Sequence, residues 1–95
     1  MKKYVAQIKQ VRHHNKRKLY EWTFIAHGDR CGVLVVPMPM ETEMVRMIAS
    51  AATGKELDAG HELDVGAELI GRWLGLTMDD DDGLVSVWPI REMNE

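Results

Sequence analysis

The sequence predicts a small, mostly β domain with one helix, in the order strand, strand, strand, helix, strand, strand. Several short runs alternate apolar and polar side chains and are separated by turn-forming residues. Residues 41–53 instead repeat their apolar side chains at the helical period. The chain of 95 residues is 45% hydrophobic and 28% charged, which suits one globular domain, so we treat residues 1–95 as a single unit.

The first two strands are predicted to form a hairpin. Residues 3–13 alternate, and Val11 follows Ile8 by three positions, which places it on the opposite face and indicates a bulge or sharp bend. Residues 13–18 contain no apolar side chain and predict a solvated hairpin loop. The second strand, residues 19–27, carries on one face Tyr20, Trp22, Phe24 and Ala26.

The third strand is predicted to be short. Residues 32–36 are continuously apolar, and Pro37 and Pro39 are expected to end the strand. The segment 33–36 would form an exposed edge, which suits pairing between two copies in a homodimer.

The helix is predicted over residues 41–53. Glu41 or Thr42 suits its positive start, and Gly54 is a favourable terminating residue. Residues 55–66 are rich in Gly, Asp and Glu and predict a connecting loop.

A second hairpin is predicted at the end of the chain. Residues 69–78 are interpreted as a twisted strand because two glycines weaken a helix, although a short helix within 67–78 is the alternative. Residues 79–83 predict the hairpin tip, and residues 84–90 the last strand. That strand carries on one face Leu84, Ser86, Trp88 and Ile90.

These elements fit two architectures. The first is a small antiparallel barrel of the oligonucleotide-binding (OB) type, in which the helix plugs one end and the sheet edges are hidden. The second is an α+β fold, an open antiparallel sheet packed by one helix, which uses the same elements.

Charge is distributed unevenly along the chain. Residues 1–30 carry a net charge of +6 and residues 31–95 one of −9, which gives −3 for the whole chain. Such asymmetry can place a positive face on a protein whose net charge is negative, so a polyanion is a candidate ligand.

The chain also resembles a known group, the small phage-type single-stranded-DNA-binding proteins of OB fold that accompany recombination functions. The resemblance lies in KYVAQI at residues 3–8, in the basic turn before residues 19–24, and in LIGR at residues 69–72. It implies an OB fold and a DNA-binding function associated with replication or recombination in a phage or mobile element.

The nucleic-acid-binding hypothesis assigns phosphate contacts to basic side chains and base stacking to aromatic ones. Its basic candidates are Lys9, Arg12, Lys16, Arg17 and Lys18. Its aromatic candidates are Tyr20 and Trp22, although both, with Phe24, would equally suit the core side of the second strand. The basic loop has an alternative as well, an ordinary solvated tip. Trp73 and Trp88 are expected to fill the barrel, with a role as ligand platforms as the less favoured alternative. Stacking and phosphate contacts distinguish sugars poorly, so both DNA and RNA stay open.

A second hypothesis is a small phage-type protein-interaction or inhibitor module. Its acidic face would mimic nucleic-acid charge, with Glu41 and Glu43 at the helix start. The rest of that face is the tip of the last hairpin, formed by Asp79, Asp80, Asp81 and Asp82.

Other functional classes find little support in the sequence. No set of nucleophile, base and cleft-forming loop can be assembled, so we expect no enzyme and no cofactor. His13 and His14 are adjacent rather than spaced as zinc ligands, so no metal site is expected. Cys31 is the single cysteine, which excludes an intrachain disulfide and suggests a reducing compartment. No apolar stretch reaches the roughly 20 residues of a membrane span, so we expect a cytoplasmic protein without membrane contact.

Overall fold

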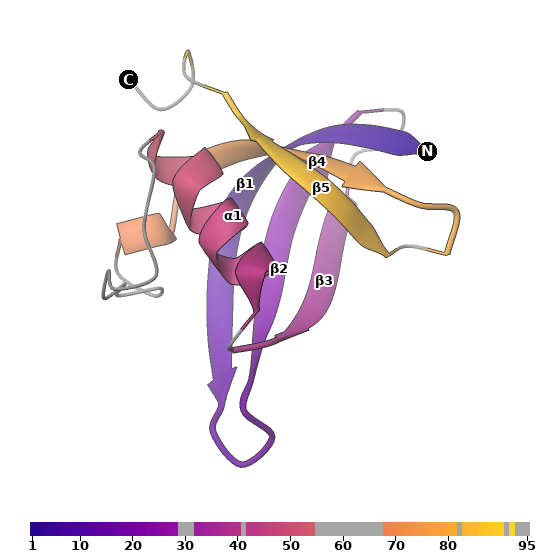
Figure 1. The fold of residues 1–95 in the computed structure, drawn as a ribbon. Coiled ribbons are helices and arrows are strands. Elements are labelled where there is room, and N and C mark those ends of the chain that lie inside the picture. Colours follow the sequence, from indigo (N-terminus) through magenta and orange to yellow (C-terminus); the bar gives the residue numbers. More distant parts are fainter. Residues whose placement is uncertain (29–31, 41, 55–67, 82, 91, 93–95) are drawn as a thin grey trace.

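One antiparallel sheet and one helix make up the regular structure of this chain in the computed structural model (Figure 1). The structure describes residues 1–28, 32–40, 42–54, 68–81, 83–90 and 92. The elements are β1 (Lys2–His14), β2 (Leu19–His27), β3 (Gly32–Pro39), α1 (Glu43–Thr53), β4 (Trp73–Met78) and β5 (Leu84–Pro89). The predicted order of strands and helix is therefore confirmed. Cys31, Glu41, Asp82 and the loop predicted over residues 55–66 lie outside the described residues.

The sheet is open. Its strand order is β3-β2-β1-β4-β5, and every neighbouring pair is antiparallel. β3 and β5 are the two edges, and the described parts of these strands do not pair with each other. The described structure is thus the open sheet with one packed helix, and no pairing closes it into a barrel.

The bulge predicted in the first strand is confirmed. The register of β1 against β2 shifts between Ile8 and Gln10, with Lys9 at the shift. As a result Val11 pairs with Trp22 and packs against the same core as Ile8. The bulge lets Val11 join Tyr4, Ala6 and Ile8 on the inner face of this long strand.

The core lies between the inner face of the sheet and α1, which packs against β4 and β5. Its largest fully buried side chains are Trp22, Phe24, Ile8, Ile48, Leu69, Leu74, Leu76 and Met78. The rings of Trp22 and Phe24 stack with centroids 6.1 Å apart. Burial of each such side chain stabilises the fold by roughly 1.5–3 kcal/mol, which explains why these positions set the strand faces.

The helix begins and ends where the sequence predicts its terminal residues. Thr42 is the N-cap residue, but its hydroxyl makes no capping bond and instead donates to the Pro39 carbonyl at 3.2 Å. Gly54 adopts a left-handed φ of 72° and donates its N–H to the Ser50 carbonyl at 2.9 Å. A glycine suits this C-terminal position because a Cβ disfavours positive φ.

Two strand predictions were wrong in detail. β3 continues through Pro37 and Pro39 rather than ending before them, because β3 is an edge strand whose outer side needs no N–H donors. Leu84 and Trp88 do not share a face, because the β4–β5 register shifts between Thr77 and Met78. That shift turns Leu84 toward the core and places Trp88 opposite Gly75 on the outer face.

Between residues 67 and 78, strand and helix both occur. Glu68 and Leu69 are helical, and β4 begins only at Trp73. Gly71 separates the two with a φ of 86° and donates its N–H to the Ile8 carbonyl at 2.7 Å. The strand interpretation therefore holds for the second half of this segment.

Candidate nucleic-acid interface

The loop between β1 and β2 is a tight, defined turn. The N–H groups of Arg17 and Lys18 donate to the carbonyls of His14 and Asn15 at 3.2 and 3.3 Å. Lys18 adopts a positive φ of 51°, and its carbonyl accepts the Met40 N–H at 2.9 Å. That last hydrogen bond connects the hairpin loop to the residue after β3. The backbone that carries the basic side chains is therefore fixed by hydrogen bonds.

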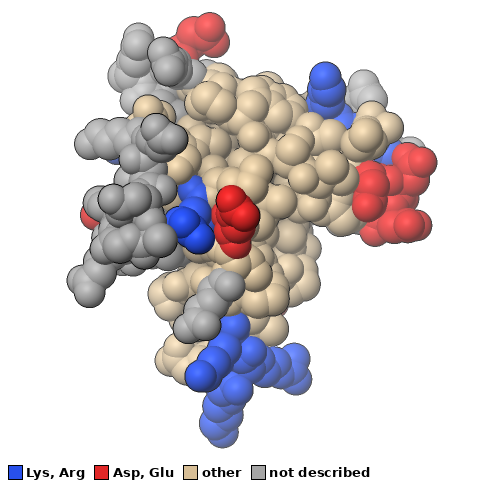
Figure 2. Space-filling model, viewed as in Figure 1, with Lys and Arg blue, Asp and Glu red and all other residues tan. Residues whose placement is uncertain are grey.

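The basic tip, defined here as Lys16, Arg17 and Lys18, is fully solvated. All three side chains are exposed, and the hairpin projects beyond the end of the helix (Figure 1). Figure 2 shows Lys and Arg side chains gathered at this end, with no acidic side chain of a described residue directly beside them. No carboxylate of a described residue lies within ion-pair distance of the tip. Its charge is therefore available to a polyanion.

The remaining basic candidates lie along β1. Arg12 is exposed on the outer face of the sheet, with Nη1 3.9 Å from Glu21 Oε1. His14 shares that carboxylate, with Nε2 3.6 Å from Oε2. Exposed pairs of this kind contribute little stability, so Arg12 can exchange Glu21 for a phosphate at small cost. Lys9 is exposed at the bulge, separate from the tip.

The two aromatic candidates have different environments. Trp22 is 0% exposed and lies in the core, so it cannot stack on a base while the sheet is intact. Tyr20 is only partly buried, near the tip, and its ring meets that of His13 edge to face at 5.0 Å. His13 is exposed. From the sequence, His13 is considered only as a possible metal ligand and not as a ring for base stacking. Tyr20 and His13 thus form the aromatic pair closest in sequence to the basic tip.

Trp73 and Trp88 lie on the outer face of the sheet instead of filling its interior. Trp73 pairs with Gln7, between the inward-facing Ala6 and Ile8, and Trp88 pairs with Gly75. Both rings are half-buried. Their outward position follows from the pairing of β4 with β1 and of β5 with β4. The alternation of apolar and polar residues in the sequence does not reveal that pairing.

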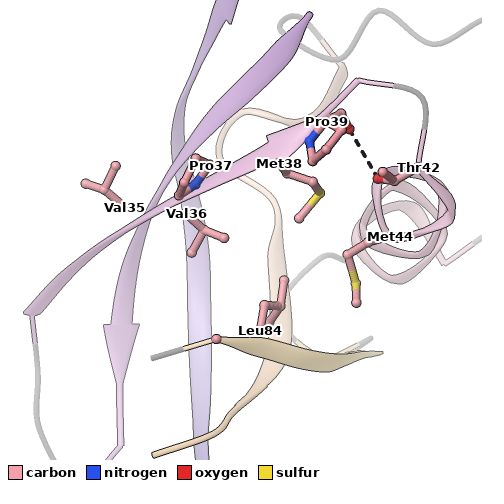
Figure 3. A pocket seen from close by; sticks show the side chains of 9 residues that line it. Val35, Val36, Pro37, Met38, Pro39, Thr42, Met44 and Leu84 are labelled. Carbon is pink, nitrogen blue, oxygen red and sulfur yellow. Dashed lines mark hydrogen bonds between the residues drawn. The ribbon is translucent and has the colours of Figure 1, made fainter. Parts of the chain in front are cut away.

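An apolar groove of about 450 Å³ separates the two sheet edges (Figure 3). Residues of β3, the start of α1 and the start of β5 line it, among them Val36, Met38, Met44 and Leu84. It lies at the side of the sheet where a barrel would need β3 to pair with β5. On the outer face of β3, Val33 and Val35 are 65% and 56% exposed.

The acidic tip, defined here as Asp79, Asp80 and Asp81, lies at the β4–β5 hairpin, away from the basic tip (Figure 2). Asp79 Oδ1 accepts the N–H groups of Asp81 and Gly83 at 2.9 and 2.7 Å, so this carboxylate shapes the turn. Asp80 and Asp81 are exposed. The two tips separate positive from negative charge along the molecule.

Within the described ranges, no three His, Cys, Asp or Glu side chains gather closely enough to hold a metal ion. The helix in the described part of the chain is too short and too polar to cross a lipid bilayer. No protein-family model matches this chain, and no curated protein is significantly similar to it. The function must therefore be argued from the geometry alone.

Proposed function

We propose that this chain is a non-catalytic module that binds single-stranded nucleic acid through the β1–β2 hairpin. The observation that carries the proposal is the basic tip, three adjacent cationic side chains on a well-defined turn with no carboxylate of a described residue in ion-pair distance. Phosphate contacts by Lys and Arg supply most of the affinity of such modules, through release of counterions.

The aromatic pair beside the tip supports a single-stranded ligand. Bases of an unpaired strand are free to stack on aromatic rings, which is worth roughly 1–3 kcal/mol per base. Of Tyr20, Trp22 and Phe24, Tyr20 keeps some exposed surface. His13 presents a second ring next to it. In this proposal Lys16, Arg17 and Lys18 hold phosphates while Tyr20 and His13 contact bases.

The strand order supports an OB-like architecture as part of the same proposal. An OB barrel is a partly open, five-stranded antiparallel structure whose second and third strands and first hairpin loop contact oligonucleotides. The order β3-β2-β1-β4-β5, with a helix between β3 and β4, is compatible with such a barrel lacking only a β3–β5 pairing. The basic tip is the first hairpin loop in this arrangement.

The acidic tip limits where the ligand can run. An OB protein also uses the loop between its fourth and fifth strands, but here that loop carries Asp79, Asp80 and Asp81. These carboxylates would repel a phosphate chain, so we place the ligand on the β1–β2 side of the molecule.

The test is binding of a fluorescein-labelled 15-nucleotide oligo(dT), followed by anisotropy over a series of salt concentrations. The wild-type protein should bind with an affinity that falls steeply as salt rises. The double variant Lys16→Ala/Arg17→Ala should bind more weakly, and the slope of log K against log salt should fall by about 0.7 for each phosphate contact removed.

A charge-matched control separates the hairpin from net charge. Lys2→Ala/Arg46→Ala removes the same charge from the start of β1 and from α1. It should leave affinity and salt slope close to wild type. Equal losses in the two double variants, or no binding by the wild-type protein at low salt, would overturn the proposal.

A further inference from the structure

We propose that His27, Trp73 and Trp88 form a second base-stacking site, the outer platform, on the face of the sheet opposite α1. The inference rests on the proposed function, because it takes the same single-stranded nucleic acid and extends its path from the basic tip. The sequence favours Trp73 and Trp88 as barrel fillers over ligand platforms and does not single out His27.

The register of the sheet builds the outer platform from three strands. Gln7 of β1 pairs with Trp73 of β4, while Val5 pairs on one side with His27 of β2 and on the other with Gly75. The rings of His27 and Trp73 therefore meet across β1, stacked with centroids 5.8 Å apart and planes 29° from parallel. Trp88 covers Gly75, next to Trp73 on the same face.

The outer platform is accessible. His27 is exposed, and both indoles keep part of their surface in solvent. α1 packs on the inner face with the core, so it does not cover these rings. Aromatic rings held on the solvent side of a sheet offer faces on which bases of any sequence can stack.

The charge and polarity around the rings identify the ligand. The outer face of β1 presents Lys3, Gln7 and Arg12, and Glu21 is the acidic side chain opposite Arg12. The same face carries Val5 between His27 and Gly75, and Ile25 beside Gln7. Exposed cations near aromatic rings suit a phosphate chain with unstacked bases. Val33 and Val35 are also exposed on this face, so a second copy of the chain is the competing occupant, and the sedimentation measurement below detects it.

The outer platform is also continuous with the hairpin. The strands β1 and β2 carry both sites on opposite faces, because Tyr20 and His13 lie on the inner side with Trp22, so the nucleic acid would pass around the edge of the hairpin. Gln7 lies seven residues from His14, where the loop begins. At about 3.3 Å per residue this is roughly 23 Å. At the axial rise of a base-stacked strand, about 3.4 Å per nucleotide, that distance takes about seven nucleotides, and an extended strand takes fewer. A 15-nucleotide probe is long enough to reach from the basic tip to the outer platform.

The experiment compares oligo(dT) of 15 nucleotides with an abasic oligonucleotide of the same length. Trp73→Leu and His27→Ala should each weaken oligo(dT) binding by about 5- to 140-fold, the range that loss of one stacked base implies. Binding of the abasic chain should not change. Trp73→Phe keeps an aromatic ring and should retain most of the affinity, which separates stacking from a folding defect.

Met47→Ala is the matched control, because Met47 is an exposed apolar side chain on α1. It should behave as wild type with both probes. If Trp73→Leu and His27→Ala bind oligo(dT) normally while Lys16→Ala/Arg17→Ala does not, the outer platform is refuted and the proposed function survives. If wild type binds neither probe, both fail. If Trp73→Leu changes only the molar mass of the protein in sedimentation experiments, the rings belong to a contact between copies and the inference is wrong.

Discussion

The indole of Trp88 occupies the space that a side chain at Gly75 would fill. The two residues are a cross-strand pair of β4 and β5, and a Cβ built on Gly75 would fall on the Trp88 ring. The glycine lets the ring lie over the outer surface of β4 rather than project into solvent. One missing side chain therefore positions a large aromatic group of the outer platform.

Gly75→Ala is expected to destabilise the fold, although alanine is usually the better strand residue. The methyl group must displace Trp88, and such overpacking costs about 1–3 kcal/mol. Denaturant unfolding measures the change. Gly32→Ala is the control, because a Cβ at Gly32 meets no atom within 4 Å. In a Trp88→Ala background the cost of Gly75→Ala should largely vanish. An equal cost with and without Trp88 would refute the proposed contact.

Lys18→Gly should be more stable than Lys16→Gly by about 1–2 kcal/mol, the usual cost of a left-handed backbone in a residue with a Cβ. Lys18 has that conformation, with φ of 51°, and Lys16 does not. Each variant loses one charge and introduces one glycine, so the effects on the unfolded chain cancel in the comparison. Thermal unfolding of the two variants at one pH checks the difference. Equal stability would mean that the turn is not formed as described.

Asp79→Ala should cost about 1–2 kcal/mol, because two backbone N–H groups of the acidic tip lose their acceptor. For a domain of this size each kcal/mol lowers the Tm by roughly 4–8 °C. Asp80→Ala removes the same charge from an exposed side chain and should change stability by less than about 0.5 kcal/mol. Similar Tm values for the two variants would contradict the turn-forming role of Asp79.

Pro37→Val/Pro39→Val should increase self-association. Each proline lacks an N–H donor, and prolines in edge strands point their nitrogen away from the sheet. The replacement adds two donors to the free edge of β3, where Val33 and Val35 are already exposed. Light scattering should show a larger mass for the variant than for wild type at equal concentration. Unchanged mass over a wide range of concentrations would show that the prolines do not protect this edge.

Local patterns predicted most of the elements correctly. The period-two face of β2, the bulge in β1 and the termini of α1 depend on neighbouring residues and on burial of one face. The basic tip was also predicted. A run of cationic residues between two alternating segments indicates a solvated hairpin loop, because charged side chains are not buried in the core.

The candidate site was predicted less well. Trp22 and Tyr20 share a face of β2, so their spacing could not separate a buried ring from one near the hairpin. Trp22 is buried and Tyr20 is not, because the core covers only part of β2. Which part it covers depends on where the helix and β4 pack. Asp79 looked like part of a charged patch, but its carboxylate accepts two backbone bonds within the turn.

The sequence by itself determined the order of the elements, the hairpin turns, the helix ends and the separation of charge, because each depends on residues close together in the chain. The tertiary structure alone decided that the described sheet is open and that Trp73 and Trp88 face outward. Both outcomes depend on register between distant strands. A register shift of one residue reverses the face of every side chain beyond it, and the energy that selects the register comes from packing across the whole core.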